Sequence, residues 1–345
     1  MQRVLVTGGS GFFGELLKHA LLDEGLECVN VDLKTDATSH PRLTSHVADI
    51  LDTGALETIF SQQPIDCVFH CAAVLSHAAR HRDFLWNCNV EGTRNVARCA
   101  AKFQVPKVVF VSTNCLWAES FAAPVTEEEP PRPGEIYGES KLAAEMVLQE
   151  FSDRFDSVII RTPTIIGPGR LGLLTILFEF IDEGRRVWVV GGGKNRIQFV
   201  DADDLAQACI KGMRYEGSGT FNVGSDDVKS LGEVYEYVIQ QAGTRARVAV
   251  LPRGVTLNLM RIAYFLRLSP LGPYQYKAIA ESFQFDTSKA HRELGWNPTA
   301  TNEQALFKAY EYYHKNLAEI RQRKDVSAHK QPAKLGLIRL LKWLS

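Results

Sequence analysis

Val4-Leu5-Val6-Thr7-Gly8-Gly9-Ser10-Gly11-Phe12-Phe13-Gly14 opens the chain with an apolar run followed by closely spaced glycines. The apolar run predicts a strand, the glycines predict a turn, and residues 15–22 predict a helix. The spacing Gly8-x-x-Gly11-x-x-Gly14 allows a tight turn and a close approach of the backbone to a pyrophosphate. The helix N-terminus that follows favours an anion. The stretch therefore predicts a dinucleotide site rather than a turn alone.

A second predicted strand, 28–32, ends in the carboxylate of Asp32. This acid lies at the distance along the chain expected for a residue that binds the adenosine ribose. Its carboxylate oxygens would accept hydrogen bonds from the ribose hydroxyls, and its negative charge would repel a 2′-phosphate. Both effects favour NAD over NADP. Lys34 is a nearby cation that keeps NADP open as the minority option.

Short apolar strands alternate with helices through the first half of the chain. We predict a third short segment that ends at 47–50, a fourth strand with its exit over 67–73, and strands at 107–111 and 158–161. A helix is predicted from about 84 to 102. This alternation predicts the α/β class, with a Rossmann doubly wound parallel sheet and right-handed crossovers. Ser112-Thr113-Asn114 directly follows one of these strands, at the carboxyl end where such sheets bind ligands.

After Arg161 the pattern changes, because the breaker-rich run 162–170 predicts a loop that leaves the sheet. After it we predict a helix at 171–183, a strand at 186–190, a helix capped by the acids of 199–204, a strand and turn at 219–224, and a helix at 231–241. We expect an NAD-binding Rossmann domain over 1–165, to which 196–225 returns. A smaller, interleaved α/β substrate lobe is expected over 166–195 and 226–320.

The composition excludes several classes of protein. The 345 residues carry 39 lysines and arginines against 40 acids, so no basic excess indicates nucleic acid. No apolar run of about eighteen residues predicts a membrane-spanning helix, and the chain starts in a strand pattern, so no signal peptide is expected. The seven cysteines form no disulfide framework. Cys67, His70 and Cys71 lie in a buried-strand pattern, which favours reduced thiols over a metal site. Because the cysteines are expected to be reduced, we expect a cytoplasmic protein.

Tyr137-Gly138-Glu139-Ser140-Lys141 places a phenol and an ammonium one helical turn apart on one face. A phenol has a pKa of about 10, and a fixed cation beside it lowers that value. Such a pair can exchange a proton with a carbinol while a hydride moves elsewhere. Taken alone, the same residues could instead form a solvated helix face.

Together and in this order, these motifs resemble the extended short-chain dehydrogenase/reductase family, of the NAD-dependent epimerase/dehydratase type. The resemblance runs from residue 1 to about 315. Beside the glycine turn, Asp32, Tyr137 and Lys141, it is carried by Asp49, His70-Cys-Ala-Ala73, Asn89, Ser112-Thr113, Phe199 to Asp204, Phe221-Asn-Val-Gly224, Asp286-x-Ser-Lys-Ala290 and Leu294-Gly-Trp-x-Pro298.

The resemblance implies a catalytic Thr-Tyr-Lys site. In it Thr113 bonds the reacting oxygen, Tyr137 is the acid/base, and Lys141 binds the nicotinamide ribose and tunes Tyr137. Asn89 is implied to hold backbone and lysine in place. NAD is the implied cofactor, with contacts from Gly8, Gly11, Phe12, Phe13, Gly14, Asp32, Asp49, Ile50, Ala72, Ala73, Tyr137, Lys141 and Pro163. A homodimer is also expected, with a small-molecule substrate that candidate residues Ser76, Asn114, Thr164 and Arg196 contact.

Departures from the family pattern narrow the activity. Family 4,6-dehydratases follow the active-site threonine with Asp-Glu, whereas this chain has Asn114-Cys115, so dehydration is not expected. Many nucleotide-sugar enzymes have a substrate-binding Asn where this chain has Thr164. The position of their diphosphate-binding arginine is Ile197, with Arg196 one place earlier, and their later Arg-Pro-Gly-Asp motif is absent.

Two stretches suggest contact with hydrophobic ligands or surfaces. Residues 255–268 are apolar nearly all round, as in hydroxysteroid dehydrogenase-like relatives and some epimerases of lipid-linked sugars, although a lobe-packing helix would read the same way. Residues 321–345 carry seven basic side chains against Asp325, and Leu337, Leu340, Leu341 and Leu344 share one helix face. This tail predicts peripheral contact with an anionic membrane, or docking on the protein's own core or a partner.

The expected function is that of an NAD-dependent epimerase or oxidoreductase acting on a secondary alcohol or ketone of a sugar nucleotide or lipid-linked sugar. The alternative is a dehydrogenase or reductase of a sterol-like or other hydrophobic alcohol. A non-catalytic dinucleotide sensor is less favoured, because it would usually lose Tyr137 or Lys141.

Overall fold

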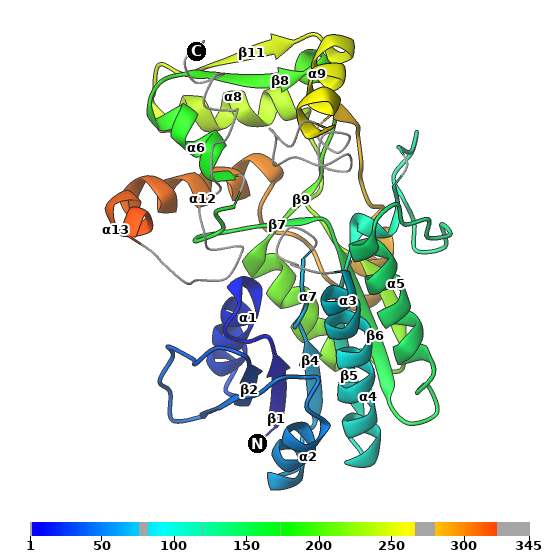
Figure 1. Cartoon of the computed structure of the whole chain (residues 1–345). Coiled ribbons are helices and arrows are strands. Elements are labelled where there is room, and N and C mark those ends of the chain that lie inside the picture. The colour runs from blue at the N-terminus through cyan, green and yellow to red at the C-terminus, as the bar shows by residue number, and fades with distance from the viewer. Residues whose placement is uncertain (1, 76–81, 119, 173, 266–279, 323–345) are drawn as a thin grey trace.

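The computed structural model describes residues 2–75, 82–118, 120–172, 174–265 and 280–322. Figure 1 shows a larger lobe built around a sheet, which includes the N-terminal part of the chain, and a smaller lobe beyond the carboxyl ends of the sheet strands. The expected α/β architecture is therefore present.

The sheet of the larger lobe is built from β1 (Arg3–Thr7), β2 (Glu27–Asp32), β3 (Leu43–Val47), β4 (Cys67–His70), β5 (Lys107–Thr113), β6 (Asp156–Thr162) and β10 (Gly219–Asn222). These seven strands are parallel, in the order β10-β6-β5-β4-β1-β2-β3. The order reverses between β1 and β4, as in a doubly wound Rossmann sheet, which confirms the predicted fold class. Strands such as β1 read as unbroken apolar runs because both faces of the sheet are covered.

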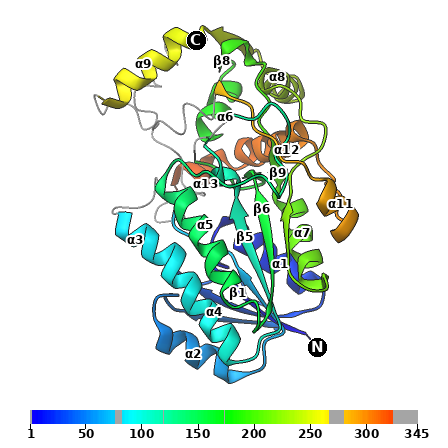
Figure 2. The same cartoon turned by 90° about the vertical axis from the view of Figure 1, so that its right-hand side faces the viewer.

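Helices cover both faces of this sheet (Figure 2). One face carries α1 (Phe12–Asp23), α7 (Ala202–Arg214) and α11 (Ser288–Leu294); the other carries α2 (Thr53–Gln62), α4 (Gly92–Lys102) and α5 (Ile136–Gln149). Leu17 and Leu21 of α1 share one core cluster with Val4 and Val6 of β1. On the opposite face Leu56 and Ala144 pack with Leu5, because successive strand residues point to opposite faces.

The helix predicted over about 84–102 contains one wider turn. α3 (Arg82–Trp86) continues through the π-helical turn η1 (Asn87–Glu91) into α4. Single π turns inside helices are frequent at functional sites, and this one carries Asn89.

The smaller lobe consists of α6 (Leu174–Asp182), β8 (Arg186–Val190), η3 (Gly191–Gly193), α8 (Leu231–Ala242), β11 (Arg247–Leu251), α9 (Arg253–Phe265), α12 (Asn302–Lys315) and α13 (Leu317–Gln322). β8 and β11 pair in parallel. Phe178, Val187, Val238 and Leu306 bring α6, β8, α8 and α12 together in one core.

The run 162–170, predicted as a loop throughout, contains a short strand. Thr164–Ile166 forms β7, which pairs in parallel with β9 (Phe199–Asp201). Ile165 and Ile166 are β-branched and favour extended backbone. The breakers Gly167 and Pro168 follow the strand instead of interrupting it.

The expected division of the chain remains a proposal. We propose that 1–165 with 196–225 forms the NAD-binding domain, and that 166–195 with 226–320 forms the substrate lobe. In support, β10 pairs with β6 in the large sheet, and α7 packs against α1, although both come after the first segment of the smaller lobe.

The helix predicted over 255–268 corresponds to α9, of which residues 266–268 lie outside the described residues. Val255, Leu259, Ile262 and Phe265, which we name the apolar face of α9, are 55–85% exposed. These four side chains are therefore not packed into the protein core. Within the described ranges, no helix is long and apolar enough to cross a membrane. Residues 323–345 of the predicted tail are outside those ranges.

Candidate active site

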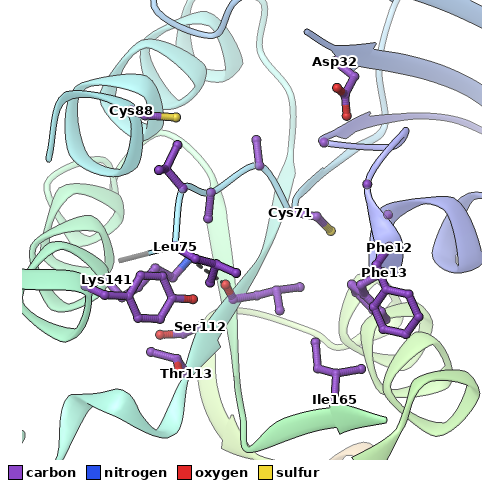
Figure 3. A pocket seen from close by; sticks show the side chains of 18 of the residues that line it. Phe12, Phe13, Asp32, Cys71, Leu75, Cys88, Ser112, Thr113, Lys141 and Ile165 are labelled. Carbon is purple, nitrogen blue, oxygen red and sulfur yellow. Dashed lines mark hydrogen bonds between the residues drawn. The ribbon is translucent and has the colours of Figure 1, made fainter. Parts of the chain in front are cut away.

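A cavity lies at the carboxyl ends of the sheet strands, where the strand order reverses (Figure 3). Phe12, Phe13 and Asp32 lie on one side of it, and Thr113 and Lys141 lie on the other. Its lining includes these predicted cofactor and catalytic residues: Gly8, Gly11, Phe12, Phe13, Gly14, Asp32, Asp49, Ile50, Ala72, Ala73, Thr113, Tyr137, Lys141 and Pro163.

The glycine turn forms a cradle that side chains would fill. Gly8 has a φ of +74°, and a Cβ on it would lie 2.8 Å from the Cα of Ala72. A Cβ on Gly14 would lie 2.1 Å from the carbonyl oxygen of Gly8, so α1 could not approach the turn. Gly11 is the N-cap of α1 and makes no side-chain capping bond. A helix start of this kind suits an anion, so these residues fit the diphosphate of a dinucleotide.

Asp32 ends β2 with its carboxylate held by two backbone groups. The backbone nitrogens of Ser10 and Lys34 donate to it at 3.0 and 2.9 Å. The carboxylate is thereby fixed at the cavity, where a ribose hydroxyl would need an acceptor. Lys34 lines the same end of the cavity.

Thr113 and Tyr137 meet because α5 packs against the short turn η2 (Asn114–Leu116), which follows β5 in the chain. Only a glycine permits this approach, since a Cβ on Gly138 would lie 2.1 Å from the carbonyl oxygen of Cys115. The Tyr137 phenol is hydrogen-bonded to the Thr113 hydroxyl. Two exchangeable protons therefore face the cavity side by side.

Lys141 lies one turn along α5 and is 3% exposed. Its ammonium donates to the carbonyl oxygen of Val111 at 2.8 Å and lies 3.8 Å from the centroid of the Phe110 ring. Burial lowers the pKa of Lys141 to about 8, against the opposing charge of Glu145. The side chain is therefore still protonated at neutral pH.

Burial and charges other than that of Lys141 account for the pKa of Tyr137 in this structure, and the tuning of Tyr137 by Lys141 stays a prediction. Burial raises the pKa of Tyr137 above its ordinary value, and the cation that opposes this rise is Arg170. The Lys141 ammonium is instead engaged by the Val111 carbonyl and the Phe110 ring. In this structure the Tyr137 phenol is therefore protonated.

Asn89 fixes the backbone beside the site. Its side-chain oxygen accepts from the nitrogen of Val74 at 2.7 Å, and its side-chain nitrogen donates to the oxygen of Val74 at 3.0 Å. The same nitrogen donates to the hydroxyl of Ser140 at 2.9 Å. Asn89 thus connects the backbone after β4 to Ser140 of α5, the residue before Lys141. Asn89 does not bond Lys141 itself, whose ammonium donates to Val111.

Sequence reasoning missed a buried ion pair behind the site. Glu145 and Arg161 are 2% and 7% exposed, and the Arg161 guanidinium donates to the carboxylate at 2.7 and 3.2 Å. Ser112 also donates to Glu145. Together with Ser112, the pair joins α5 to β5 and β6. Thr113 ends β5, and Tyr137 and Lys141 lie on α5. Its signal in the sequence was an acid four residues after Lys141 on the same helix face.

Of the four residues predicted to contact the substrate, two line the cavity. Asn114 and Thr164 line the cavity, whereas Ser76 lies outside the described residues. Arg196 is exposed, is not among the lining residues, and donates to the carbonyl oxygen of Val228 at 3.2 Å, so the structure does not bring it to this cavity. Arg170, which no sequence motif indicated, does line it.

His70 has a structural role between two threonines. Its ring nitrogens lie 2.6 Å from the hydroxyl of Thr7 and 2.9 Å from that of Thr93. Burial lowers the pKa of His70 to about 3, so the ring is neutral. Burial also raises the pKa of the Cys71 thiol to about 12. Among the residues that the structure describes, no group of three or more His, Cys, Asp or Glu side chains could hold a metal ion.

The model of the NAD dependent epimerase/dehydratase family matches residues 4–224. This chain belongs to that family. It is accordingly an NAD-dependent enzyme of the extended short-chain dehydrogenase/reductase type, and the cradle and Asp32 described above fit this cofactor.

Two curated relatives and one solved structure span nearly the whole chain. An uncharacterized protein of Sinorhizobium fredii, y4nG, is 38% identical over 343 residues, which cover 99% of this chain and 86% of that one. A 3-beta-hydroxysteroid dehydrogenase of Mycolicibacterium neoaurum is 26% identical over 336 residues, 90% of this chain and 91% of that one. The structure of UDP-glucose 4-epimerase with UDP-glucose from Thermotoga maritima aligns with a TM-score of 0.77 and 24% identity, over 92% of this chain and 100% of that one, which shows the same fold.

The position of Asp32 predicts the choice between the two dinucleotides. NADH should bind at least tenfold more tightly than NADPH, a difference of about 1.4 kcal/mol, because the carboxylate repels a 2′-phosphate. Fluorescence titration with both cofactors measures this, and Asp32→Ser should narrow the ratio. Equal affinities in the unmodified protein would contradict the role of Asp32 and favour that of Lys34.

Proposed function

We propose that this enzyme is an epimerase that inverts a secondary alcohol of a sugar nucleotide or lipid-linked sugar and keeps its NAD bound between turnovers. The observation that carries the proposal is the meeting of Thr113, Tyr137 and Lys141 at one side of a cavity whose other side fits the adenosine half of a dinucleotide. The likeness to the UDP-glucose 4-epimerase structure supports a nucleotide-sugar substrate.

In the proposed mechanism the Thr113 and Tyr137 hydroxyls bind the reacting oxygen of the substrate together. Bound NAD supplies the carbon that accepts the hydride and later returns it. Tyr137 must lose its own proton before the cycle begins. As a phenolate it takes the carbinol proton in the oxidative half, and as a phenol it gives that proton back to the ketone oxygen in the reductive half. Lys141 remains cationic at neutral pH, so it can bind the nicotinamide ribose. Catalysis depends on holding the substrate against the proton acceptor, Tyr137, and against the hydride acceptor, the nicotinamide, at the same time.

The residues after Thr113 favour epimerisation over dehydration. Eliminating water from a sugar needs an acid and a base in addition to Tyr137, and family dehydratases place Asp-Glu there. Here Asn114 and Cys115 line the cavity instead. An amide and a thiol do not supply that pair of carboxylates.

Activity with UDP-glucose and UDP-galactose tests the proposal. An epimerase should interconvert the two sugars, or a related pair of nucleotide sugars, without a net change in nicotinamide absorbance. Stoichiometric production of NADH from any substrate would contradict it and indicate a dehydrogenase.

A dehydrogenase or reductase of a hydrophobic alcohol is the second candidate. The apolar face of α9 favours it, because Val255, Leu259 and Ile262 expose an apolar stripe on the substrate lobe. The similarity to a 3-beta-hydroxysteroid dehydrogenase points the same way. NADH formation with a 3β-hydroxysteroid, and no reaction with nucleotide sugars, would select this candidate.

We also propose that the basic tail attaches the enzyme to an anionic membrane surface. Each basic side chain near such a surface contributes about 1 kcal/mol, and the attraction weakens as salt rises. A chain truncated after Gln322 should keep its thermal stability and lose co-sedimentation with vesicles that contain phosphatidylserine. A collapse in stability, or an intact chain that ignores these vesicles at low salt, would contradict membrane attachment.

We propose further that the enzyme is a cytoplasmic homodimer. Light scattering of the purified protein should then give twice the mass of the 38.5 kDa chain. A mass equal to that of one chain would contradict the dimer.

A further inference from the structure

One cation that lines the cavity has no ligand assigned to it in the site as described so far. Among the described lining residues the basic side chains are Lys34, Lys141 and Arg170. Lys34 lies beside Asp32, and Lys141 bonds Val111. Arg170 belongs to the loop that leaves β7 for the smaller lobe, outside the glycine turn and the Thr-Tyr-Lys motif.

Arg170 lies over the start of α1. The central carbon of its guanidinium is 5.7 Å from the centroid of the Phe12 ring, and Phe12 is the first residue of that helix. The same loop approaches this point at Gly167, where a Cβ would lie 3.6 Å from the ring of Phe12. The loop from β7 therefore places a positive side chain beside the helix end that the glycine turn presents to the cavity.

The charge of Arg170 has no anionic partner within the described part of the chain. Its contacts there are the Phe12 ring and the electrostatic interaction with the neutral Tyr137 phenol. Arg170 is half-buried, and burial lowers the pKa of its guanidinium to about 10, so the side chain is still charged at neutral pH. A cation that is partly removed from water is stabilised by an anionic partner, and the planar guanidinium matches the paired oxygens of a phosphate.

The geometry of the cavity indicates which anion meets it. A dinucleotide whose adenosine ribose is at Asp32 and whose nicotinamide is at Thr113 and Lys141 must pass its diphosphate between them. That middle part of the cavity is bounded by the glycine turn and the start of α1. The diphosphate is the charged part of the ligand there, and Arg170 approaches from the opposite lobe.

We propose that Arg170 binds the diphosphate of bound NAD and so closes the cofactor site from the side of the smaller lobe. The proposal rests on the NAD site alone and not on which alcohol the enzyme transforms. Because the loop leads directly into α6, release of NAD would require this contact to open. That arrangement suits a cofactor that stays bound through many turnovers.

Binding measurements on apoprotein test the proposal without any substrate. Arg170→Gln should raise the Kd for NADH and for ADP-ribose at least tenfold, because both contain the diphosphate. The affinity for adenosine, which has no phosphate, should stay the same. Raising the salt concentration should weaken NADH binding by the unmodified protein more than by Arg170→Gln.

Two further variants keep the test decisive. Arg170→Lys retains the charge and should recover part of the lost affinity, which a variant damaged in folding would not do. Arg247→Gln removes an exposed arginine of the smaller lobe and should bind NADH like the unmodified protein. Unchanged Kd values for NADH and ADP-ribose in Arg170→Gln would overturn the proposal whatever happens to turnover, and an equal loss for adenosine would do the same.

Discussion

Replacing Tyr137 with phenylalanine should lower turnover by about 10²–10⁴-fold, the usual contribution of a positioned acid or base. The ring and its packing remain, and only the transferable proton is lost. Because the substitution leaves the glycine turn and Asp32 unchanged, the Kd for NADH should change little. Steady-state kinetics and a fluorescence titration on the same preparation separate the two effects.

Two further variants accompany this prediction, one inside the site and one outside it. Thr113→Val removes the hydroxyl that shares the reacting oxygen and should also reduce turnover, but less completely. Tyr235→Phe removes a partly buried phenol from α8 in the smaller lobe. Tyr235 is not among the cavity residues, so this variant should leave turnover unchanged. Near-normal turnover by Tyr137→Phe would remove this residue from the mechanism.

Glu145→Gln should lower the free energy of unfolding by about 3–5 kcal/mol, the usual cost of breaking a buried ion pair from one side. The substitution leaves the Arg161 guanidinium 7% exposed and without its carboxylate. Ser112 loses the same partner. Because the pair, together with Ser112, joins α5 to β5 and β6, any folded Glu145→Gln protein should also lose turnover. Urea unfolding followed by circular dichroism measures the stability change.

Glu150→Gln is the matched control for the ion pair. Glu150 is the C-cap of the same helix and pairs with Arg94, but its carboxylate is exposed. Exposed pairs contribute little, so this variant should unfold like the unmodified protein. If Glu145→Gln did so too, the buried pair would not be what holds α5 in register with the sheet.

The sequence predicted the fold and the cofactor half of the site because local pattern dictates both. Strand 3–7, the glycine turn and α1 are consecutive, so glycine spacing and apolar periodicity were enough to place Gly8, Gly11, Gly14 and Asp32 together. The same applies to Thr113, which ends a buried strand, and to Tyr137 and Lys141, which are one turn apart on α5.

What the sequence could not predict depends on contacts between distant residues. β7 exists because Thr164–Ile166 pairs with a strand more than thirty residues later. The orientation of the Lys141 ammonium follows from the Val111 carbonyl on β5, and burial, which the motif alone does not reveal, raises the pKa of Tyr137. Arg170 and Arg196 look alike in sequence, and only the folded loop brings one of them to the cavity.

The amount of NAD that co-purifies with the protein tests the central claim most directly. The proposed epimerase cycle returns the hydride to the substrate, so the cofactor need not leave, and Arg170 would hold it in place. Denaturing the freshly purified protein and assaying the supernatant should release close to one NAD(H) per chain. Protein that carries no NAD, yet binds and releases it freely during turnover, would contradict the account and favour the dehydrogenase.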